Sequence, residues 1–252
     1  MELQALQKKL AKQLTQNLKV RIVQEDSFCI PVHTLQVSYH PVQRTAMDIL
    51  MKMMLISFSK AEIEHVETLA HILLVEPLFI NDLTNKMVKT GIITKETGTY
   101  QLTSKGEQQL VNGIFEEELE LTSRILQYST VHKAILHGDI EEVLEFGEFP
   151  ELFAYLEQEE LGDVDNSLLI SELVAMQDNT DDDDTPQTYI TSIASTEELQ
   201  INDVPYVQFV LYEAAEDRYF ARIYNTLTNS WDEVVEQLVN EKERTSWREK
   251  FA

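Results

Sequence analysis

Leucines recur at helical spacing near the start of the chain. Leu3, Leu6, Leu10, Leu14 and Leu18 are three, four, four and four positions apart, so a helix over residues 2–18 has one apolar stripe. The stripe can pack on its own domain or on the same helix of a second copy, although about two and a half heptads are few for a coiled coil. The pattern predicts an N-terminal helix and leaves a homodimer through it as an alternative.

Two β-rich runs follow this helix. "KVRIVQ" and "FCIPVHTLQVSY" flank the turn-like "EDS", which predicts a β-hairpin, so residues 1–41 are expected to hold a helix and a hairpin. Pro41 is placed to open the next helix, running to about Phe58. Two more helical patterns follow, and they are separated at Glu76-Pro77, because the residue before proline is pushed out of the helical region.

The stretch "TGIITKETGTYQLTSKGEQQL" predicts a second hairpin. Ile92–Lys95 and 99–102 are short β-rich runs, and Glu96-Thr97-Gly98 between them supplies the turn. Thr103 comes directly after the hairpin, where its hydroxyl can cap a further helix.

The second half of the chain is more polar. Residues 116–177 are acidic and contain short amphipathic patterns, which predict a mainly helical segment. "DNTDDDDTPQ", residues 178–187, is expected to be a linker. Residues 188–252 alternate apolar and polar positions in three runs and then become helical from about Ser230, which predicts a small α+β unit.

The order helix, helix, turn, helix, hairpin over residues 42–110 resembles the winged helix-turn-helix, especially the bacterial MarR- and PadR-like kind. The step Gly91-Ile92-Ile93 and the run from Tyr100 to Gly106, which matches the family's "YxLTxxG" wing exit, carry the resemblance. The expected fold class is therefore α+β, with a winged-helix domain over 42–115, a helical acidic middle segment and the small α+β C-terminal unit. The resemblance implies nucleic-acid or partner contact at polar positions of the third helix and the wing: Asn81, Asn85, Lys86, Lys89, Lys95, Thr99 and Lys105.

Charge changes what this resemblance implies about function. The formal net charge is -24, yet residues 1–115 hold 12 Lys+Arg and 11 Asp+Glu, whereas residues 116–252 hold 8 and 33. No arginine lies between residues 77 and 105, and Asp82 and Glu96 sit among the lysines there. The acidic half repels nucleic acid and anionic membranes at range.

Catalytic chemistry is sparse in the sequence. The six histidines are scattered, with no HExxH pair, no glycine-rich phosphate loop and no GxSxG turn. We therefore expect no catalytic residue, no cofactor and no metal site. With 33 acids in residues 116–252, an enzyme with a carboxylate site there stays open as an alternative.

The single Cys29 excludes a disulfide framework and fits a small buried side chain. The N-terminus lacks the apolar core of a signal peptide, and "AMDILMKMMLISF" is broken by Asp48 and Lys52 and too short to span a bilayer. These features predict a cytoplasmic protein with no membrane partner.

The leading functional hypothesis is a non-catalytic, bacterial winged-helix adaptor or regulatory subunit of a DNA-associated assembly. Its acidic C-terminal half would bind a protein partner that is basic or DNA-associated. The alternative is an autonomous transcription regulator that binds double-stranded DNA as a dimer through residues 77–105.

Overall fold

The computed structural model describes residues 3–16, 19–145, 149–156, 161–177 and 187–251. The chain divides into two compact units, each built from separate stretches of sequence. Unit 1 consists of Met1–Val37, Ser123–Glu172 and Ser195–Ala252, and unit 2 consists of Ser38–Thr122 and Leu173–Ala194. The ranges expected from the sequence are contiguous, whereas these units are not.

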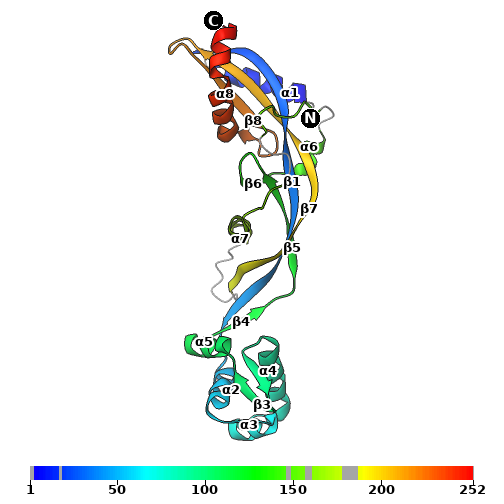
Figure 1. The fold of residues 1–252 in the computed structure, drawn as a ribbon, viewed down its shortest axis with the longest axis vertical. Coiled ribbons are helices and arrows are strands. Elements are labelled where there is room, and N and C mark those ends of the chain that lie inside the picture. The colour runs from blue at the N-terminus through cyan, green and yellow to red at the C-terminus, as the bar shows by residue number, and fades with distance from the viewer. Residues whose placement is uncertain (1–2, 17–18, 146–148, 157–160, 178–186, 252) are drawn as a thin grey trace. The chain divides into compact units, whose positions relative to one another are not determined.

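A seven-stranded antiparallel sheet organises the chain (Figure 1). Its order is β6-β5-β1-β7-β8-β9, and β4 also pairs with β1. The strands are β1 (Val20–Ala46), β4 (Ile114–Glu118), β5 (Thr122–Ser129), β6 (Ala134–Leu136), β7 (Gln187–Glu213), β8 (Arg218–Asn225) and β9 (Ser230–Trp231). The expected fold class, with a winged-helix domain in the first half, is therefore wrong: strands from both halves join one sheet, and β1 and β7 are 27 residues long each.

β1 replaces two elements that were expected from the sequence. It runs without a break through residues 25–27, where a turn was expected, and through Pro41, where a helix was expected to begin. Pro41 cannot donate to the ladder, but its carbonyl accepts the Leu119 N–H at 2.8 Å. Helix α2 (Ile49–Lys60) begins only after Asp48, whose Oδ1 accepts the Leu50 N–H at 2.8 Å.

The second half also differs from its expected form. The middle segment supplies β4, β5 and β6 besides two short helices, α6 (Ile140–Leu144) and α7 (Asn166–Ala175), so it is not mainly helical. The predicted linker lies, apart from Gln187, outside the described residues. The last helix, α8 (Glu233–Phe251), starts after Asp232 rather than at Ser230.

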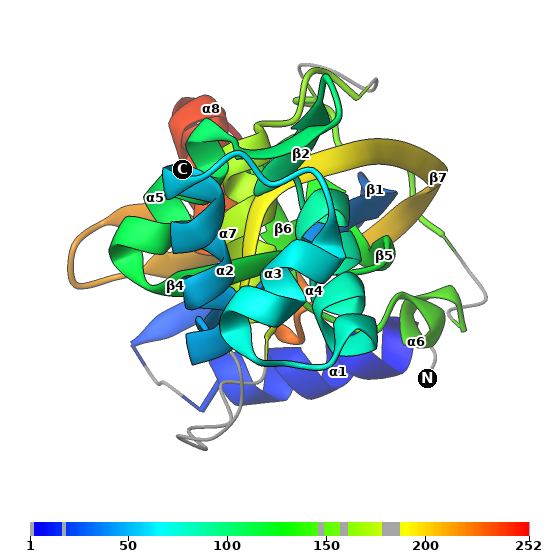
Figure 2. The same cartoon turned by 90° about the horizontal axis from the view of Figure 1, so that it is seen from below.

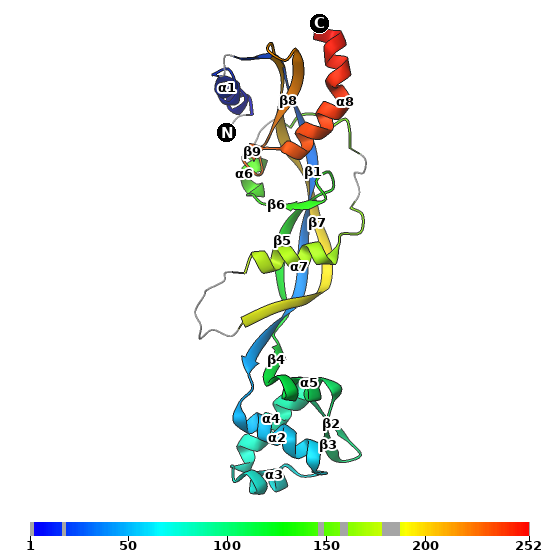
Figure 3. The same cartoon turned by 90° about the vertical axis from the view of Figure 1, so that its left-hand side faces the viewer.

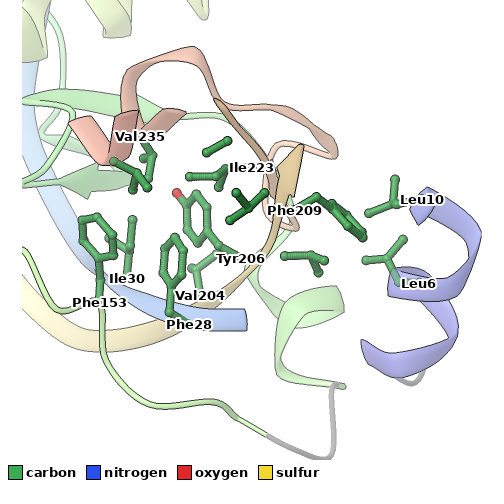
Figure 4. Close-up of a cluster of buried hydrophobic side chains, with 14 of the residues drawn as sticks. Leu6, Leu10, Phe28, Ile30, Phe153, Val204, Tyr206, Phe209, Ile223 and Val235 are labelled. Atoms are coloured by element: carbon green, nitrogen blue, oxygen red, sulfur yellow. The ribbon is translucent and has the colours of Figure 1, made fainter. Parts of the chain in front are cut away.

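The core of unit 1 is built from side chains of β1, β7 and β8 (Figure 4). Phe28 of β1 stacks on Tyr206 of β7 with ring centroids 5.6 Å apart. Helix α1 (Leu3–Leu14) lays Leu6 and Leu10 on this core, where they are 7% and 3% exposed. Leu3 and Leu14 are partly buried against the same core, so these four leucines of the stripe are covered within their own unit, and Leu18 lies outside the described residues.

Four helices and a two-stranded hairpin surround the core of unit 2 (Figures 2 and 3). They are α2, α3 (Val66–Leu73), α4 (Pro77–Lys89), β2 (Ile93–Glu96), β3 (Thr99–Leu102) and α5 (Ser104–Asn112). Met54, Leu55, Leu69, Ile80 and Met87 are fully buried at their centre.

The hairpin prediction is confirmed. Thr97 and Gly98 both have positive φ, 51° and 94°, as a two-residue hairpin turn requires. The Thr103 hydroxyl accepts the Gly106 N–H at 3.1 Å and donates to the Gly91 carbonyl at 2.7 Å. A Cβ on Gly106 would lie 2.0 Å from the Ile92 carbonyl oxygen, so the contact between α5 and the hairpin requires glycine here.

Candidate protein-binding surface

The polar residues expected to contact a nucleic acid or a partner all lie in unit 2. Asn81, Asn85 and Lys89 are exposed on α4, but the exposed Asp82 lies among them. Among the described residues, Lys89 has no ion-pair partner. This face of α4 therefore carries little net positive charge.

The other expected contact residues are engaged within the chain. Lys86 Nζ lies 2.7 Å from Glu117 Oε2 and 5.1 Å from the centroid of the Phe115 ring. Lys95 Nζ lies over the Tyr100 ring at 4.6 Å, the Thr99 hydroxyl donates to the Glu96 carbonyl at 3.0 Å, and Lys105 Nζ donates to the Thr90 carbonyl at 3.1 Å. Contact with a phosphate would have to compete with these interactions.

The outer face of α2 is apolar, and it was not singled out from the sequence. Met54, Leu55 and Phe58 on the inner face are buried, whereas Ile49, Met53 and Ile56 are 75%, 46% and 43% exposed. At 3.6 residues per turn, these three side chains and Lys60 fall within an arc of about 60°. We call Ile49, Lys52, Met53, Ile56 and Lys60 the α2 outer face.

A helix that is apolar on all sides is normally buried on all sides. In α2 only one of the two apolar faces is covered by the rest of unit 2. The sequence carried a signal for this, because "ILMKMMLISFSK" has apolar residues on two opposite sides of the helix and not along one stripe. Contiguous exposed apolar patches are typical of interaction sites, which makes this face a candidate for one.

A second apolar group lies at the corner between α3 and α4. Ile72, Leu78 and Phe79 are exposed, and Leu74 is 91% exposed in the left-handed conformation, with φ 56°. A leucine is strained in that conformation, and Leu74 gains no burial there in return. The exposed acid Glu76 lies within the corner, so its chemistry differs from that of the α2 outer face.

Arg44 of β1 lines a hollow of about 230 Å³ between the α5 and β4 residues of unit 2. Its Nε donates to Glu116 Oε1 at 2.7 Å, and its guanidinium lies over the Tyr189 ring at 4.4 Å. The hydrogen bond to Glu116 raises the pKa of Arg44. Lys105, the other cation of the hollow, donates to Thr90, so an incoming anion would compete with partners that are already present.

A serine, a histidine and an aspartate meet inside unit 1. His132 Nδ1 lies 2.7 Å from Ser129 Oγ, and His132 Nε2 lies 2.9 Å from Asp232 Oδ2. Serine hydrolases use the same three residue types, but there the histidine Nε2 faces the serine and Nδ1 faces the aspartate, the reverse of the arrangement here. Ser129 is fully buried, however, so a substrate carbonyl has no access to its hydroxyl.

The surroundings of Asp232 indicate a structural role for this network. Its Oδ1 accepts the Val235 N–H at the start of α8, and its Oδ2 accepts a hydrogen bond from Asn225 at 3.1 Å. Burial raises the pKa of Asp232, but the hydrogen bonds and the charge of His132 outweigh it, so the net pKa is lowered. The network joins the turn between β5 and β6 to α8.

No protein-family model, curated protein or solved structure matches this chain. The resemblance to winged helix-turn-helix proteins therefore gains no support from known proteins. The function has to be argued from the chemistry of the surfaces described above.

A metal site, a reactive thiol and a membrane-spanning helix were the remaining candidates, and the described residues provide none of them. Among the described residues, no three His, Cys, Asp or Glu side chains lie close enough to hold a metal ion. Cys29 is fully buried, and burial raises the pKa of its thiol to about 12. Within the same part of the chain, no helix is both long and apolar enough to cross a membrane.

Proposed function

We propose that the protein is a non-catalytic adaptor that binds a protein partner over the α2 outer face. The observation that carries the proposal is the exposure of Ile49, Met53 and Ile56 along one side of a helix whose other side is buried. Helices that present apolar side chains at this spacing are a common surface for partner helices.

The energetics indicate the size of the interface. Completing the burial of each exposed side chain contributes roughly 1 kcal/mol, about half of what full burial of an Ile or Met is worth. Association costs at least about 4 kcal/mol in lost freedom, so three side chains alone do not hold a partner. The interface must extend over neighbouring residues of unit 2, and stable interfaces bury about 800 Å² on each partner.

The surface of α4 favours a protein over DNA as the partner. DNA is held mainly by cations set against phosphates, whereas Lys86 is paired with Glu117 and Asp82 lies beside Asn81 and Asn85. Leu78, Phe79 and Val88 are also exposed on α4. The prediction of an autonomous DNA-binding regulator stays untested, and the experiment below includes an arm for it.

The test is affinity purification of the tagged full-length protein from its native cells, with and without nuclease. The wild type is compared with I49S/I56S and with a control, L199S/I201S, which removes two similarly exposed apolar side chains from β7. We expect a protein that co-purifies with the wild type and the control, survives nuclease and is lost with I49S/I56S. Partners that are all lost on nuclease treatment, or that I49S/I56S retains, would overturn the proposal.

A further inference from the structure

The α2 outer face carries positive charge and no negative charge of its own. Lys52 and Lys60 are the charged residues of "ILMKMMLISFSK", and both are exposed. Among the described residues, neither ammonium group makes an ion pair or a hydrogen bond. Three acids lie near the ends of the helix: Asp48 caps it with its Oδ1, and the exposed Glu62 and Glu64 follow Lys60 without an ion pair to it among the described residues.

The two lysines lie next to the apolar stripe of Ile49, Met53 and Ile56 on α2. Lys60 continues the line of Ile49, Met53 and Ile56, and Lys52 lies beside that line, about 60° away. The twelve residues of α2 extend about 17 Å, which corresponds to roughly three turns of a partner helix. A narrow apolar stripe flanked by charges is complementary to an amphipathic helix with matching apolar spacing and opposite charges.

We infer that the segment docking on the α2 outer face is an amphipathic helix with acidic residues beside its apolar stripe. This inference rests on the proposed function, because it names the partner for the same surface. Acidic side chains would pair with Lys52 and Lys60 as these lose water. A basic helix would bring like charges together, and such pairings weaken binding in interfaces.

A second copy of the chain fits this surface less well. Pairing α2 with its own copy would place four lysines around one apolar contact, and α2 itself offers no carboxylate to neutralise them. The net charge of -24 also repels a second copy at range. The same long-range field slows the approach of an acidic helix. We therefore expect the preference of the α2 outer face for an acidic helix to appear in the equilibrium affinity and not in the association rate.

Synthetic peptides can test this inference without knowledge of the natural partner. The probes are three helical peptides: one with an apolar stripe flanked by Glu, one with the same stripe flanked by Lys, and an acidic one with the stripe scrambled. Fluorescence anisotropy gives their Kd for full-length wild type, for K52E/K60E and for I49S/I56S. The control K8E/K9E makes the same charge change at two exposed lysines of α1.

We expect the acidic amphipathic peptide to bind wild type and K8E/K9E at least tenfold more tightly than the basic one. K52E/K60E should reverse this order, and I49S/I56S should weaken both peptides to the level of the scrambled probe. Circular dichroism spectra confirm that each variant is folded.

Four outcomes would overturn the inference. Tighter binding of the basic peptide than of the acidic one to wild type rejects an acidic partner, and so does an order of the two affinities that K52E/K60E leaves unchanged. If I49S/I56S still abolishes binding in these cases, the proposed function stands. Absence of binding by every peptide also rejects it. Self-association in sedimentation that I49S/I56S abolishes would make a second copy the occupant.

Discussion

His132 Nε2 lies 2.9 Å from Oδ2 of Asp232, a carboxylate one hundred residues later in the chain. Both side chains are almost fully buried. Asp232 also caps α8, since its Oδ1 accepts the Val235 N–H at 3.2 Å. A single carboxylate therefore holds the start of α8 and the turn between β5 and β6.

We predict that Asp232→Ala lowers the free energy of unfolding of unit 1 by about 3 kcal/mol, because it removes a helix cap and leaves buried donors unpaired. Asp232→Asn keeps an oxygen for the cap and should cost less. Urea denaturation followed by tryptophan fluorescence measures the change, since Trp231 and Trp247, the two tryptophans, both lie in unit 1.

The lowered pKa of Asp232 predicts that the stability of unit 1 depends on pH. Its pKa is below the ordinary 3.8 in the folded protein, so the stabilisation is present above pH 3.8 and is lost as the pH falls through the lowered value. Asp232→Asn should reduce this loss in acid, whereas the control Asp163→Asn, at an exposed carboxylate, should not. Equal acid sensitivity of Asp232→Asn and wild type would contradict this account.

Gly106 tests the packing of α5 against the hairpin. Gly106→Ala would set its Cβ 2.0 Å from the Ile92 carbonyl oxygen, a backbone atom that cannot turn away, and should destabilise unit 2 by about 3 kcal/mol. Gly98→Ala meets no atom within 4 Å but keeps φ at 94°, so it should cost about 1 kcal/mol. Hydrogen exchange of the amides of residues 92 and 103 measures both. Equal protection in the two variants would be inconsistent with a steric cause.

The hairpin of unit 2 could be predicted from the sequence because its determinants are local. Gly98 supplies the positive φ of its own turn, and Thr103 caps the helix that follows it through the Gly106 N–H, three positions on. The long strands could not be predicted, because their partners are distant: Arg44 of β1 lies opposite Glu116 of β4. The contact of Ser129 and His132 with Asp232 could not be predicted for the same reason, because Asp232 lies one hundred positions after His132.

The candidate surface was missed for a different reason. Periodicity shows that α2 is apolar on two opposite sides, but it does not show which of them the rest of the chain covers. The resemblance placed the candidate lysines on the third helix and the wing, but it did not show which of them pair with other side chains. Lys86 is paired with Glu117, which comes from the part of the chain assigned to another domain.

The two faces of α2 should respond differently to substitution. Met54→Ala removes a fully buried side chain and should cost about 3 kcal/mol of unit 2 stability. Ile49→Ser removes one that is 75% exposed and should change stability by less than about 0.5 kcal/mol. Thermal unfolding followed by far-UV circular dichroism distinguishes them. A cost for Ile49→Ser similar to that of Met54→Ala would mean that the outer face is already covered within the protein.

The leucine stripe of α1 provides a test of the homodimer predicted from the sequence. Because Leu10 is 3% exposed in the core of unit 1, Leu10→Ala should cost about 3 kcal/mol of stability by leaving a cavity. Sedimentation should show the same mass for wild type and variant under native conditions. A smaller mass for Leu10→Ala at unchanged stability would instead assign the stripe to a dimer.

Cys29 offers a probe of how often unit 1 opens. It is fully buried on β1, its N–H donates to the Glu151 carbonyl at 2.8 Å, and burial raises the pKa of its thiol to about 12. The thiolate is the form that attacks thiol reagents, so at pH 8 the native protein should react at least about a hundredfold more slowly than the protein in urea. Asp26→Cys in a Cys29→Ser background places a thiol at an exposed position of the same strand and should react at the unfolded rate. Rapid labelling of Cys29 in the native protein would show that the pairing of β1 with residues 151–153 is not maintained.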